Sequence, residues 1–353
     1  MMFDCLGLGS DPDMATAKAA LRKLLVREAE TICQPCLSPV WDTGLAALAL
    51  LETDDGTARA AARRGLEWLL PLQELRIVGD WAARRPGLRP GGWAFQYRNP
   101  HYPDLDDTAM VAVALDRCDA ERYREPVARA AEWISGMRSK SGGWAAFDAD
   151  NEYYYLNYIP FADHGALLDP PTADVSARCV GLMAQLGERG DKASLAVGVT
   201  YLRRVQEPGG SWFGRWGTNH IYGTWSALVA LKAAGLGPDD PTIRRAVRWL
   251  TSKQRADGGW GEDGDSYFPG EPHGEGKAAT ASQTAWALLG LIAAGEGASE
   301  AVEHGVRFLL AEQRPHGLWD EPWYTAVGFP RVFYLRYHGY RAYFPLWALA
   351  RYR

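Results

Sequence analysis

Three carboxylates stand within four positions of the chain, at Asp104, Asp106 and Asp107, directly before an apolar segment that begins at Thr108. Crowded carboxylates repel one another when ionised, so at least one should keep its proton at neutral pH, which is the condition for a general acid. A second interpretation needs no chemistry, because Asp107 could cap a helix while the others lie in a solvated turn. The spacing alone leaves both interpretations open.

Two further carboxylates occupy equivalent places, Asp42 before Thr43 and Asp174 two residues before Ser176. A helix N-terminus favours an anion, so capping is the preferred interpretation of both. A magnesium site for a diphosphate needs a pair of adjacent acids and a further acid downstream of the pair. The sequence contains three Asp-Asp pairs, and each of them lacks the downstream acid. Ionisation of a diphosphate is therefore not predicted.

A pattern built on tryptophan recurs five times and supplies the elements that must position these acids. It consists of a small residue, an aromatic three positions later, a Gln or Arg five after that, and a Gly-rich turn ending in Trp. Residues three and eight apart share one side of a helix, and the Gln or Arg can bond exposed backbone groups of the following turn. The pattern thus predicts helix ends fastened to loops. The five instances are Gly65/Trp68/Gln73/Trp81, Ala130/Trp133/Arg138/Trp144, Gly198/Tyr201/Gln206/Trp212, Ala246/Trp249/Gln254/Trp260 and Gly305/Phe308/Gln313/Trp319.

A second series runs in step with the first, because a hydroxyl residue opens an apolar segment about 35 to 38 positions before each Trp. With a helix expected over 13–31 and another over 343–351, the count is about six inner and six outer helices. We therefore predict an all-α fold, an (α/α)6 barrel built from helical-hairpin repeats. Long stretches rich in Gly, Pro and aromatics should shape one mouth of this barrel, where the inner helices begin. The hydroxyl residues are Thr43, Thr108, Ser176, Thr224 and Thr284, and the stretches are 81–106, 144–173, 209–222 and 258–280.

Composition excludes several classes of protein. The 353 residues carry a net charge of −5, and no cluster of Lys and Arg interleaves with aromatics, so nucleic acid is not an expected partner. No apolar run approaches the roughly 18 to 20 residues of a spanning helix, and the N-terminus lacks the pattern of a secretion signal. Five cysteines, with Cys33 and Cys36 as one CxxC pair, indicate buried free thiols rather than a disulfide framework or a zinc site.

Four motifs and the Trp repeats resemble those of bacterial squalene-hopene cyclases, the repeats matching the QW motifs of that family. The likeness runs essentially from residue 1 to the end, and it is to the C-terminal portion of enzymes nearly twice this length. It leaves open whether residues 1–35, an N-terminal helix, close this barrel or end a second barrel that the chain lacks. Residues 36–353 are the predicted α/α-barrel catalytic domain. The motifs are QPCLSPVWDT at 34–43, GGWAFQ at 91–96, DLDDTA at 104–109 and GSWFGRWG at 210–217.

The resemblance implies roles for individual residues. In the family the middle Asp of the DxDD motif is the proton donor, which implies that Asp106 protonates an isoprenoid double bond with support from Asp104 and Asp107. Arg178 stands where some members place a His, and it could stabilise the carboxylate that remains. Phe147 keeps the ring of a family Tyr but loses its hydroxyl, which should change product control.

Aromatic faces attract a carbocation without offering a nucleophile that would end the reaction. Core packing is the alternative role for each ring, and the motif matches favour the functional role most for Phe95, Phe329 and Phe333. The resemblance implies substrate-contacting or cation-stabilising roles for Trp41, Asp42, Phe95, Trp216, Tyr222, Phe329, Phe333, Tyr334 and Tyr337.

The implied activity is that of a class II, proton-initiated triterpene cyclase, an isomerase that converts squalene to hopene or hopanol in hopanoid biosynthesis. Because the chemistry begins at a neutral alkene, no cofactor and no metal are expected. The family's monotopic attachment implies a peripheral position on the cytoplasmic side of the cell membrane. The N-terminal half in trans, or a second copy in a homodimer, could complete the cavity.

Three alternatives stay open. Without a second wall, bound polyene would meet water, so the chain could be a truncated, inactive or split fragment that only binds a polyprenoid. A glycoside-processing (α/α)6 protein would need two carboxyls about 5 to 10 Å apart across a bond. A protein prenyltransferase subunit would need an Asp/Cys/His zinc site, and neither Cys118 nor Cys179 lies in such a pattern.

Overall fold

The computed structural model describes residues 5–27, 31–159 and 167–353, and it divides into two compact units, residues 1–37 and 38–353. The first unit contains α2 (Pro12–Lys23) and an antiparallel hairpin of β1 (Leu25–Arg27) and β2 (Thr31–Cys33). The helix expected over 13–31 therefore ends at Lys23. It ends there because the residues that follow pair as strands.

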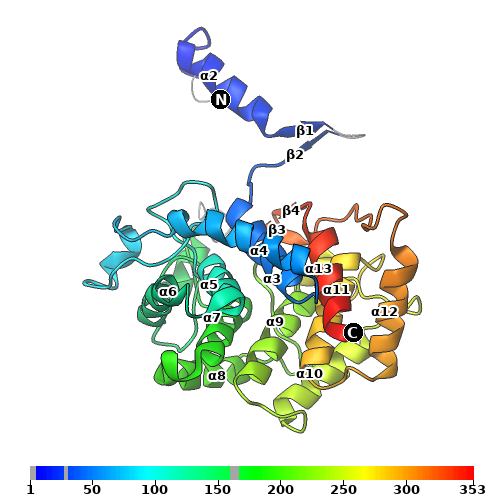
Figure 1. Ribbon diagram of the computed structural model, residues 1–353. Helices are drawn as coiled ribbons and strands as arrows, with labels where there is room; N and C mark the ends of the chain where they lie inside the picture. The colour runs from blue at the N-terminus through cyan, green and yellow to red at the C-terminus, as the bar shows by residue number, and fades with distance from the viewer. Residues whose placement is uncertain (1–4, 28–30, 160–166) are drawn as a thin grey trace. The chain divides into compact units, whose positions relative to one another are not determined.

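The second unit is built around a closed ring of six helices (Figure 1). Each inner helix contacts the next, and α13 contacts both α11 and α3, which closes the ring. The terminal segment thus supplies the sixth inner helix, and the predicted α/α barrel is confirmed. The inner helices are α3 (Pro39–Leu51), α5 (Leu105–Asp119), α7 (Ala173–Leu186), α9 (His220–Ala233), α11 (Ala281–Ala293) and α13 (Tyr340–Tyr352).

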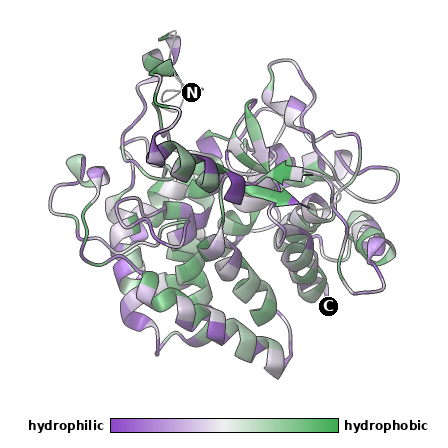
Figure 2. Ribbon diagram, turned by 90° about the horizontal axis from the view of Figure 1, so that it is seen from above, coloured by the Kyte–Doolittle hydropathy of each residue, from purple (hydrophilic) through white to green (hydrophobic). Residues whose placement is uncertain are grey.

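An outer layer of helices packs against this ring with one apolar face each. In α10, for example, Ile243, Ala246 and Leu250 are buried while the arginines between them face outward. Hydrophobic residues concentrate on the central helices and hydrophilic ones are more frequent at the periphery (Figure 2). The described part of the second unit holds five outer helices rather than the six expected, because the helix counted as the sixth lies in the first unit. They are α4 (Gly56–Leu69), α6 (Arg124–Gly136), α8 (Lys192–Arg204), α10 (Pro241–Ser252) and α12 (Glu300–Glu312).

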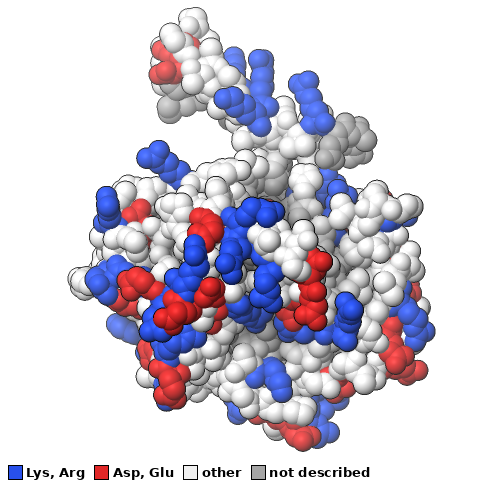
Figure 3. Space-filling view, viewed as in Figure 1, with Lys and Arg blue, Asp and Glu red and all other residues white. Residues whose placement is uncertain are grey.

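Charges of both signs mix on the surface. On the face shown in Figure 3, acidic side chains lie between basic ones. Among the exposed charges, Arg122 pairs with Glu67 at 2.7 Å, and Arg203 pairs with Asp240 at 2.6 Å. Among the described residues, none of the helices has the length and apolarity to cross a bilayer.

The repeat turns have the predicted construction. The amide of Gln206 donates to Gly210 O at 2.8 Å within its own turn and to Thr242 O at 2.9 Å at the start of the next outer helix. In the second to fifth repeats, the Trp donates its indole N–H to the carbonyl of the residue ten positions earlier. Two residues before each of these Trp residues stands a glycine with φ between 84° and 106°, a conformation that favours glycine. The helix ends are therefore fastened to their loops, as the pattern predicted. The indole bonds are Trp144 to Ile134, Trp212 to Leu202, Trp260 to Leu250 and Trp319 to Leu309, with Gly142, Gly210, Gly258 and Gly317 as the glycines.

The first repeat differs from its prediction. Trp93, not Trp81, makes the equivalent bond, with its indole N–H 2.7 Å from Leu69 O. Gln73 also reaches forward, donating to Gly91 O at 2.8 Å. Residues 74–92 form a long excursion between the two, and Trp81 in this excursion packs edge-on against Trp133. Spacing predicted a short turn because an insertion cannot be recognised from spacing alone.

The hydroxyl series connects four of the inner helices, α5, α7, α9 and α11, to the Trp turn beside each. The Thr284 hydroxyl, for example, accepts the backbone N–H of Trp260 at 2.9 Å. These hydroxyls lie one turn inside their helices, so they satisfy a buried donor of the loop rather than cap the helix. The other pairs are Thr108 with Trp93, Ser176 with Trp144 and Thr224 with Trp212, at 2.8 to 3.1 Å.

Thr284→Val should lower the free energy of unfolding by about 1 to 3 kcal/mol, because it keeps the side-chain shape but leaves the buried Trp260 N–H without an acceptor. Urea unfolding of parent and variant measures the difference. Thr200→Val on the exposed face of α8 is the matched control and should change stability by less than about 0.5 kcal/mol. Equal effects of the two substitutions would contradict a role for the hydroxyl in the repeat.

Candidate active site

The acidic turn lies where α5 begins. Asp104 is the N-cap, and its Oδ1 accepts the backbone N–H groups of Asp106 at 2.7 Å and Asp107 at 3.2 Å. The alternative in which Asp107 caps the helix and the other acids are solvated is therefore wrong. All three carboxyls are buried, with 6%, 6% and 2% of their residues' surface exposed in chain order. Capping by Asp104 leaves Asp106 and Asp107 without a helix-capping role.

Burial controls the protonation of this turn. Desolvation raises the pKa of Asp106 to about 6, although the positive charge of Arg178 lowers it and the charge of Asp174 raises it further. Desolvation and then repulsion from neighbouring carboxylates raise the pKa values of Asp104 and Asp107. The turn consequently holds protons at pH values at which exposed aspartates are ionised.

Arg178 on α7 is the fixed cation of the site. Its Nε lies 3.3 Å from Asp106 Oδ1, and its two Nη atoms donate to Ser226 Oγ and the Tyr222 hydroxyl, each at 2.6 Å. The guanidinium also lies over three rings, with 4.9 Å to the nearest centroid, that of Trp225. In the part of the chain that the structure describes, Asp106 Oδ1 and Arg178 Nε are buried without a hydrogen-bond partner. The contact between them is therefore ionic.

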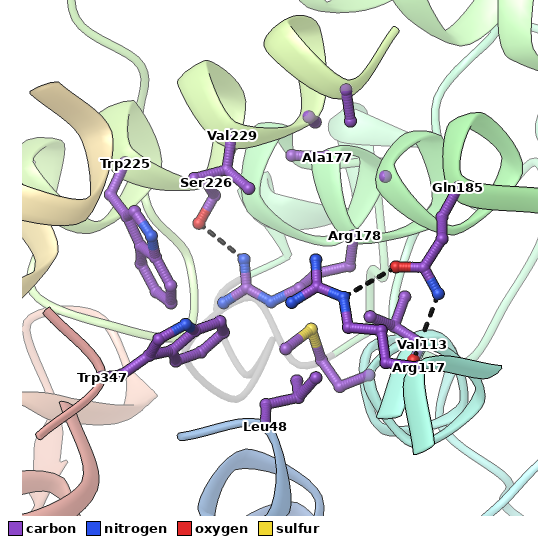
Figure 4. A pocket seen from close by; sticks show the side chains of 14 residues that line it. Leu48, Val113, Arg117, Ala177, Arg178, Gln185, Trp225, Ser226, Val229 and Trp347 are labelled. Atoms are coloured by element: carbon purple, nitrogen blue, oxygen red, sulfur yellow. Dashed lines mark hydrogen bonds between the residues drawn. The ribbon is translucent and has the colours of Figure 1, made fainter. Parts of the chain in front are cut away.

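A small pocket lies beside Arg178, between inner helices of the barrel (Figure 4). Its walls include Trp225, Trp347 and Arg117, and Arg117 donates to the Gln185 side chain at 2.9 Å. The cavity volume is about 90 Å³, which holds only a few water molecules at about 30 Å³ each. It is too small for a triterpene.

A larger cavity of about 830 Å³ opens at the mouth of the barrel. Residues from the predicted mouth stretches line it, among them Phe147 and Trp216, together with Phe329, which lies outside those stretches. Phe147 meets Trp216 edge-on with 6.2 Å between ring centroids, and the Arg215 guanidinium lies 4.2 Å from the Trp216 centroid. Two of the residues predicted to contact a cation, Trp216 and Phe329, thus face one cavity.

Asp174 and Asp42 do not cap their helices, so the capping interpretation of both is wrong. Asp174 Oδ2 accepts the backbone N–H groups of Arg215 at 2.8 Å and Trp216 at 2.9 Å, which fixes the loop that presents the Trp216 ring. Asp42 accepts the hydroxyls of Ser38 at 2.5 Å and Tyr343 at 2.8 Å. Both carboxylates therefore position neighbouring segments.

Two of the predicted aromatics surround Arg178. Tyr222 is fully buried and accepts from the guanidinium, while its ring lies 4.8 Å from Trp286. Trp41 lies under the same guanidinium and donates its indole N–H to the Tyr340 hydroxyl at 2.9 Å. Both rings contact the cation that holds Asp106, so their immediate partner in this structure is Arg178.

The remaining predicted aromatics lie on loops or on a short hairpin. Phe95 packs against Tyr337 at 6.0 Å, and Phe329 packs against Phe333 at 5.6 Å. The second pair stands at the turn of an antiparallel hairpin, β3 (Ala326–Phe329) and β4 (Phe333–Leu335), whose strands the sequence reasoning did not predict. Tyr334 donates its hydroxyl to Gly264 O at 3.1 Å, which ties this hairpin to a neighbouring loop.

Two residues of the site were missed from the sequence. Asp169 accepts the backbone N–H groups of Phe147 at 2.6 Å and Asp148 at 2.7 Å, and burial raises its pKa to about 6. Its signal was a lone acid before Pro170-Pro171 in a mouth stretch. Tyr340 joins Trp41 to the ring of Tyr337 at 5.2 Å. Its signal was the recurrence of aromatics every three residues before the last helix.

The cysteines are free within the described residues, but only Cys118 and Cys179 are buried. Cys5 and Cys33 are exposed and Cys36 is half-buried, so the expectation of buried thiols is wrong for these three.

An all-helical barrel with buried carboxyls at the start of an inner helix and aromatic rings at its mouth defines a protein of the terpene cyclase class. A type II terpene cyclase from Scytonema has the same fold, with a TM-score of 0.61 and 22% identity over 89% of this chain and 87% of that one. So does an unsaturated glucuronyl hydrolase specific for heparin, with a TM-score of 0.57 and 13% identity over 93% and 89% of the chains. The fold by itself therefore does not fix the chemistry.

Sequence gives the family. The model of the squalene-hopene cyclase C-terminal domain matches residues 37–353, and the chain belongs to the squalene-hopene cyclase family. It is 59% identical to the squalene-hopene cyclase of Bradyrhizobium diazoefficiens and 56% identical to that of Zymomonas mobilis, in each case over 100% of this chain. The chain covers 54% and 56% of those proteins, so it spans about half the length of the curated relatives it matches. The resemblance inferred from the motifs is confirmed.

The tryptophans weigh against the glycoside-processing alternative. Trp144, Trp212, Trp260 and Trp319 are at most 3% exposed and bond to their own repeats. A sugar-stacking platform needs an exposed ring face, and these rings have none.

Asp106→Asn should become more stable relative to the parent as pH rises. Burial raises the pKa of Asp106 in the folded chain to about 6. As pH rises from about 4 to about 6, the unfolded chain releases the Asp106 proton while the folded chain keeps it, so the parent loses stability over this range. Asn mimics the protonated side chain and avoids this loss. Urea unfolding at pH 4 and pH 7.5 should show the difference between variant and parent growing in the variant's favour, on the order of 2 kcal/mol. A difference that is constant or that shrinks with pH would contradict the raised pKa.

Proposed function

We propose that this chain is the acid-bearing half of a class II triterpene cyclase, which isomerises squalene to hopene and, with water, forms hopanol in hopanoid biosynthesis. The observation that carries the proposal is the buried Asp106 carboxyl, whose Oδ1 lacks a hydrogen-bond partner among the described residues and lies 3.3 Å from Arg178 Nε. A protonated carboxyl in such a place can give its proton to an alkene, which is a poor base. No cofactor is needed for this reaction.

The proposed chemistry follows from these contacts. Asp106 transfers its proton to the CH carbon of a terminal double bond of the polyene: the π bond breaks, a C–H bond forms, and the positive charge appears on the neighbouring tertiary carbon. Arg178 compensates the carboxylate that remains, and Asp104 keeps the turn in place through its two backbone bonds. The cascade ends when the last cation loses a proton to give hopene, or takes up water and then releases a proton from the added water to give hopanol. Ring faces at the mouth, such as those of Phe147, Trp216 and Phe329, would stabilise the cations.

The open mouth cavity supports a second part of the proposal. A polyene held there would meet water, which would end the cascade early. We infer that a further protein segment covers the mouth: an N-terminal half, in the same polypeptide or in trans, or a second copy of this chain. A protein that binds a polyprenoid without converting it is the second candidate function, and the exposure of the mouth cavity to water favours it.

The 353-residue chain, incubated with squalene in detergent, should form pentacyclic products that mass spectrometry detects. Asp106→Asn should form at least 100-fold less of these products than the parent. Asp116→Asn is the matched control. It removes another buried carboxyl of α5, one whose partners are Gln185 and Arg189 rather than the acidic turn. Loss of product in both variants would point to damage to the helix rather than removal of the acid.

If the parent alone is inactive, the N-terminal half of a full-length relative should be added in trans. Product formed only in that mixture, and only with Asp106 intact, would establish a cyclase that needs a second half. If no product forms with or without the added half, while the chain still binds squalene, the result would favour the polyprenoid-binding fragment. Light scattering with and without squalene tests the homodimer.

We also propose peripheral attachment to the cytoplasmic face of the cell membrane. Beside the mouth cavity, Tyr155 and Tyr158 are 67% and 87% exposed on a short 3-10 helix, Tyr154–Tyr158, and tyrosine is favoured at membrane interfaces. Replacing both by Ser should reduce cosedimentation with phosphatidylcholine–phosphatidylglycerol vesicles several-fold. Tyr352→Ser, at the opposite end of the barrel, should leave it unchanged. Equal binding by all three proteins would contradict this surface.

A further inference from the structure

We propose that Glu207, His220 and His273 form a binding site for a divalent transition-metal ion such as Zn²⁺. The three residues come from separate segments: the turn after α8, the first residue of α9, and the loop that precedes α11. Their ligand atoms all lie within 4.8 Å of one another. The site lies apart from the acidic turn, and the proposed cyclisation does not use it.

The two imidazoles lie beside one carboxylate oxygen of Glu207, which is 3.9 Å from Nδ1 of His220 and 3.5 Å from Nδ1 of His273. Their rings stack with 3.7 Å between centroids and 12° between planes. A ring nitrogen binds a metal through a lone pair in its ring plane, so two nearly parallel rings do not converge on one ion. Donor atoms about 2.0 to 2.1 Å from a tetrahedral zinc ion are roughly 3.3 Å apart. The more exposed ring, that of His273, therefore has to rotate out of the stack for the three ligand atoms to reach that arrangement.

A second carboxylate holds the histidine-bearing segments together. Buried Glu262 accepts the backbone N–H groups of Asn219 at 3.1 Å and Ile221 at 2.9 Å, the two neighbours of His220. Its other oxygen accepts the N–H of Gly274, the neighbour of His273, at 2.9 Å. One side chain thus fixes the backbone on both sides of the site, as supporting residues do around metal ligands.

Exposure and ligand type indicate which ion would bind. His220 is buried, whereas the side chains of Glu207 and His273 are 32% and 39% exposed, so an ion can enter from solvent and keep a water as its fourth ligand. Two imidazoles and one carboxylate suit Zn²⁺, Co²⁺ or Ni²⁺ better than Mg²⁺ or Ca²⁺. The Ser211 hydroxyl, 3.3 Å from His220 Nδ1, would give up that contact when the metal binds.

The bound ion would act as a structural clamp. It would join the turn after α8 and the loop before α11 to the start of α9, the helix that carries Tyr222 and Ser226. Those two side chains hold the Arg178 guanidinium, so the clamp would stabilise one wall of the acid site.

The test uses the full chain with a histidine-free tag, in a Cys33→Ser/Cys36→Ser background that removes the CxxC thiols, after metal is stripped with EDTA. Calorimetric titration with Zn²⁺ should show one ion per chain, and saturating Zn²⁺ should raise the thermal midpoint, because binding to the folded state alone stabilises it. His273→Ala and Glu207→Gln should each weaken binding at least ten-fold and reduce the thermal shift. His316→Ala, an exposed histidine elsewhere, is the control and should match the parent.

Co²⁺ provides an independent readout, since a site with nitrogen and oxygen ligands gives visible absorption without the thiolate charge-transfer band. The parent should show this spectrum, and His273→Ala should lose it. The proposal is overturned if the parent binds no stoichiometric ion. It is equally overturned if the two variants bind as the parent does, which would leave Glu207 and His273 as an ordinary ion pair.

Discussion

Burial of three carboxyl groups beside one guanidinium is the constraint on which the rest of this barrel depends. Removing an ionised group from water is strongly unfavourable unless it is paired and hydrogen-bonded, so such a turn persists only in rigid surroundings. Here two backbone N–H groups hold Asp104. Helix α7 carries Arg178, and α9 carries the two hydroxyl groups that accept its hydrogen bonds. The same burial raises the pKa of Asp106 to about 6. The unfavourable solvation of Asp106 and its proposed role as an acid have one cause.

The repeats supply that rigidity at the level of single hydrogen bonds. Four repeat turns are each closed by an indole N–H and by a hydroxyl of the adjacent inner helix, so the starts of four inner helices are tied to the loops beside them. For Thr108 the bonded turn is that of Trp93, and the same threonine follows the acidic turn by one residue. The most repetitive feature of the sequence and its most specialised feature therefore meet at one helix start.

Sequence reasoning succeeded where the information is periodic and failed where contacts join distant segments. The barrel, the repeat turns and the family followed from spacing and motifs. The helix cap did not, because Asp104 and Asp107 are equally good caps by residue type and only the backbone shows which one bonds. Asp169 and Asp174 clamp loop backbone far along the chain, and nothing local reveals such partners. Trp93 was missed because nineteen intervening residues, 74–92, hide its relation to Gln73.

The choice of Arg178 restricts how the proposed acid could be recharged. A histidine at this position could accept and release a proton near neutral pH, whereas a guanidinium keeps its charge and cannot relay one. Arg178 lines the small pocket, and its guanidinium cannot carry a proton from that pocket to Asp106. Under the proposed chemistry, the proton that Asp106 gives up would have to return by another path. A path through the mouth would require the cover of the mouth to exclude bulk water during the cascade and readmit it between turnovers, so a cover that can move suits this chemistry better than a permanent wall.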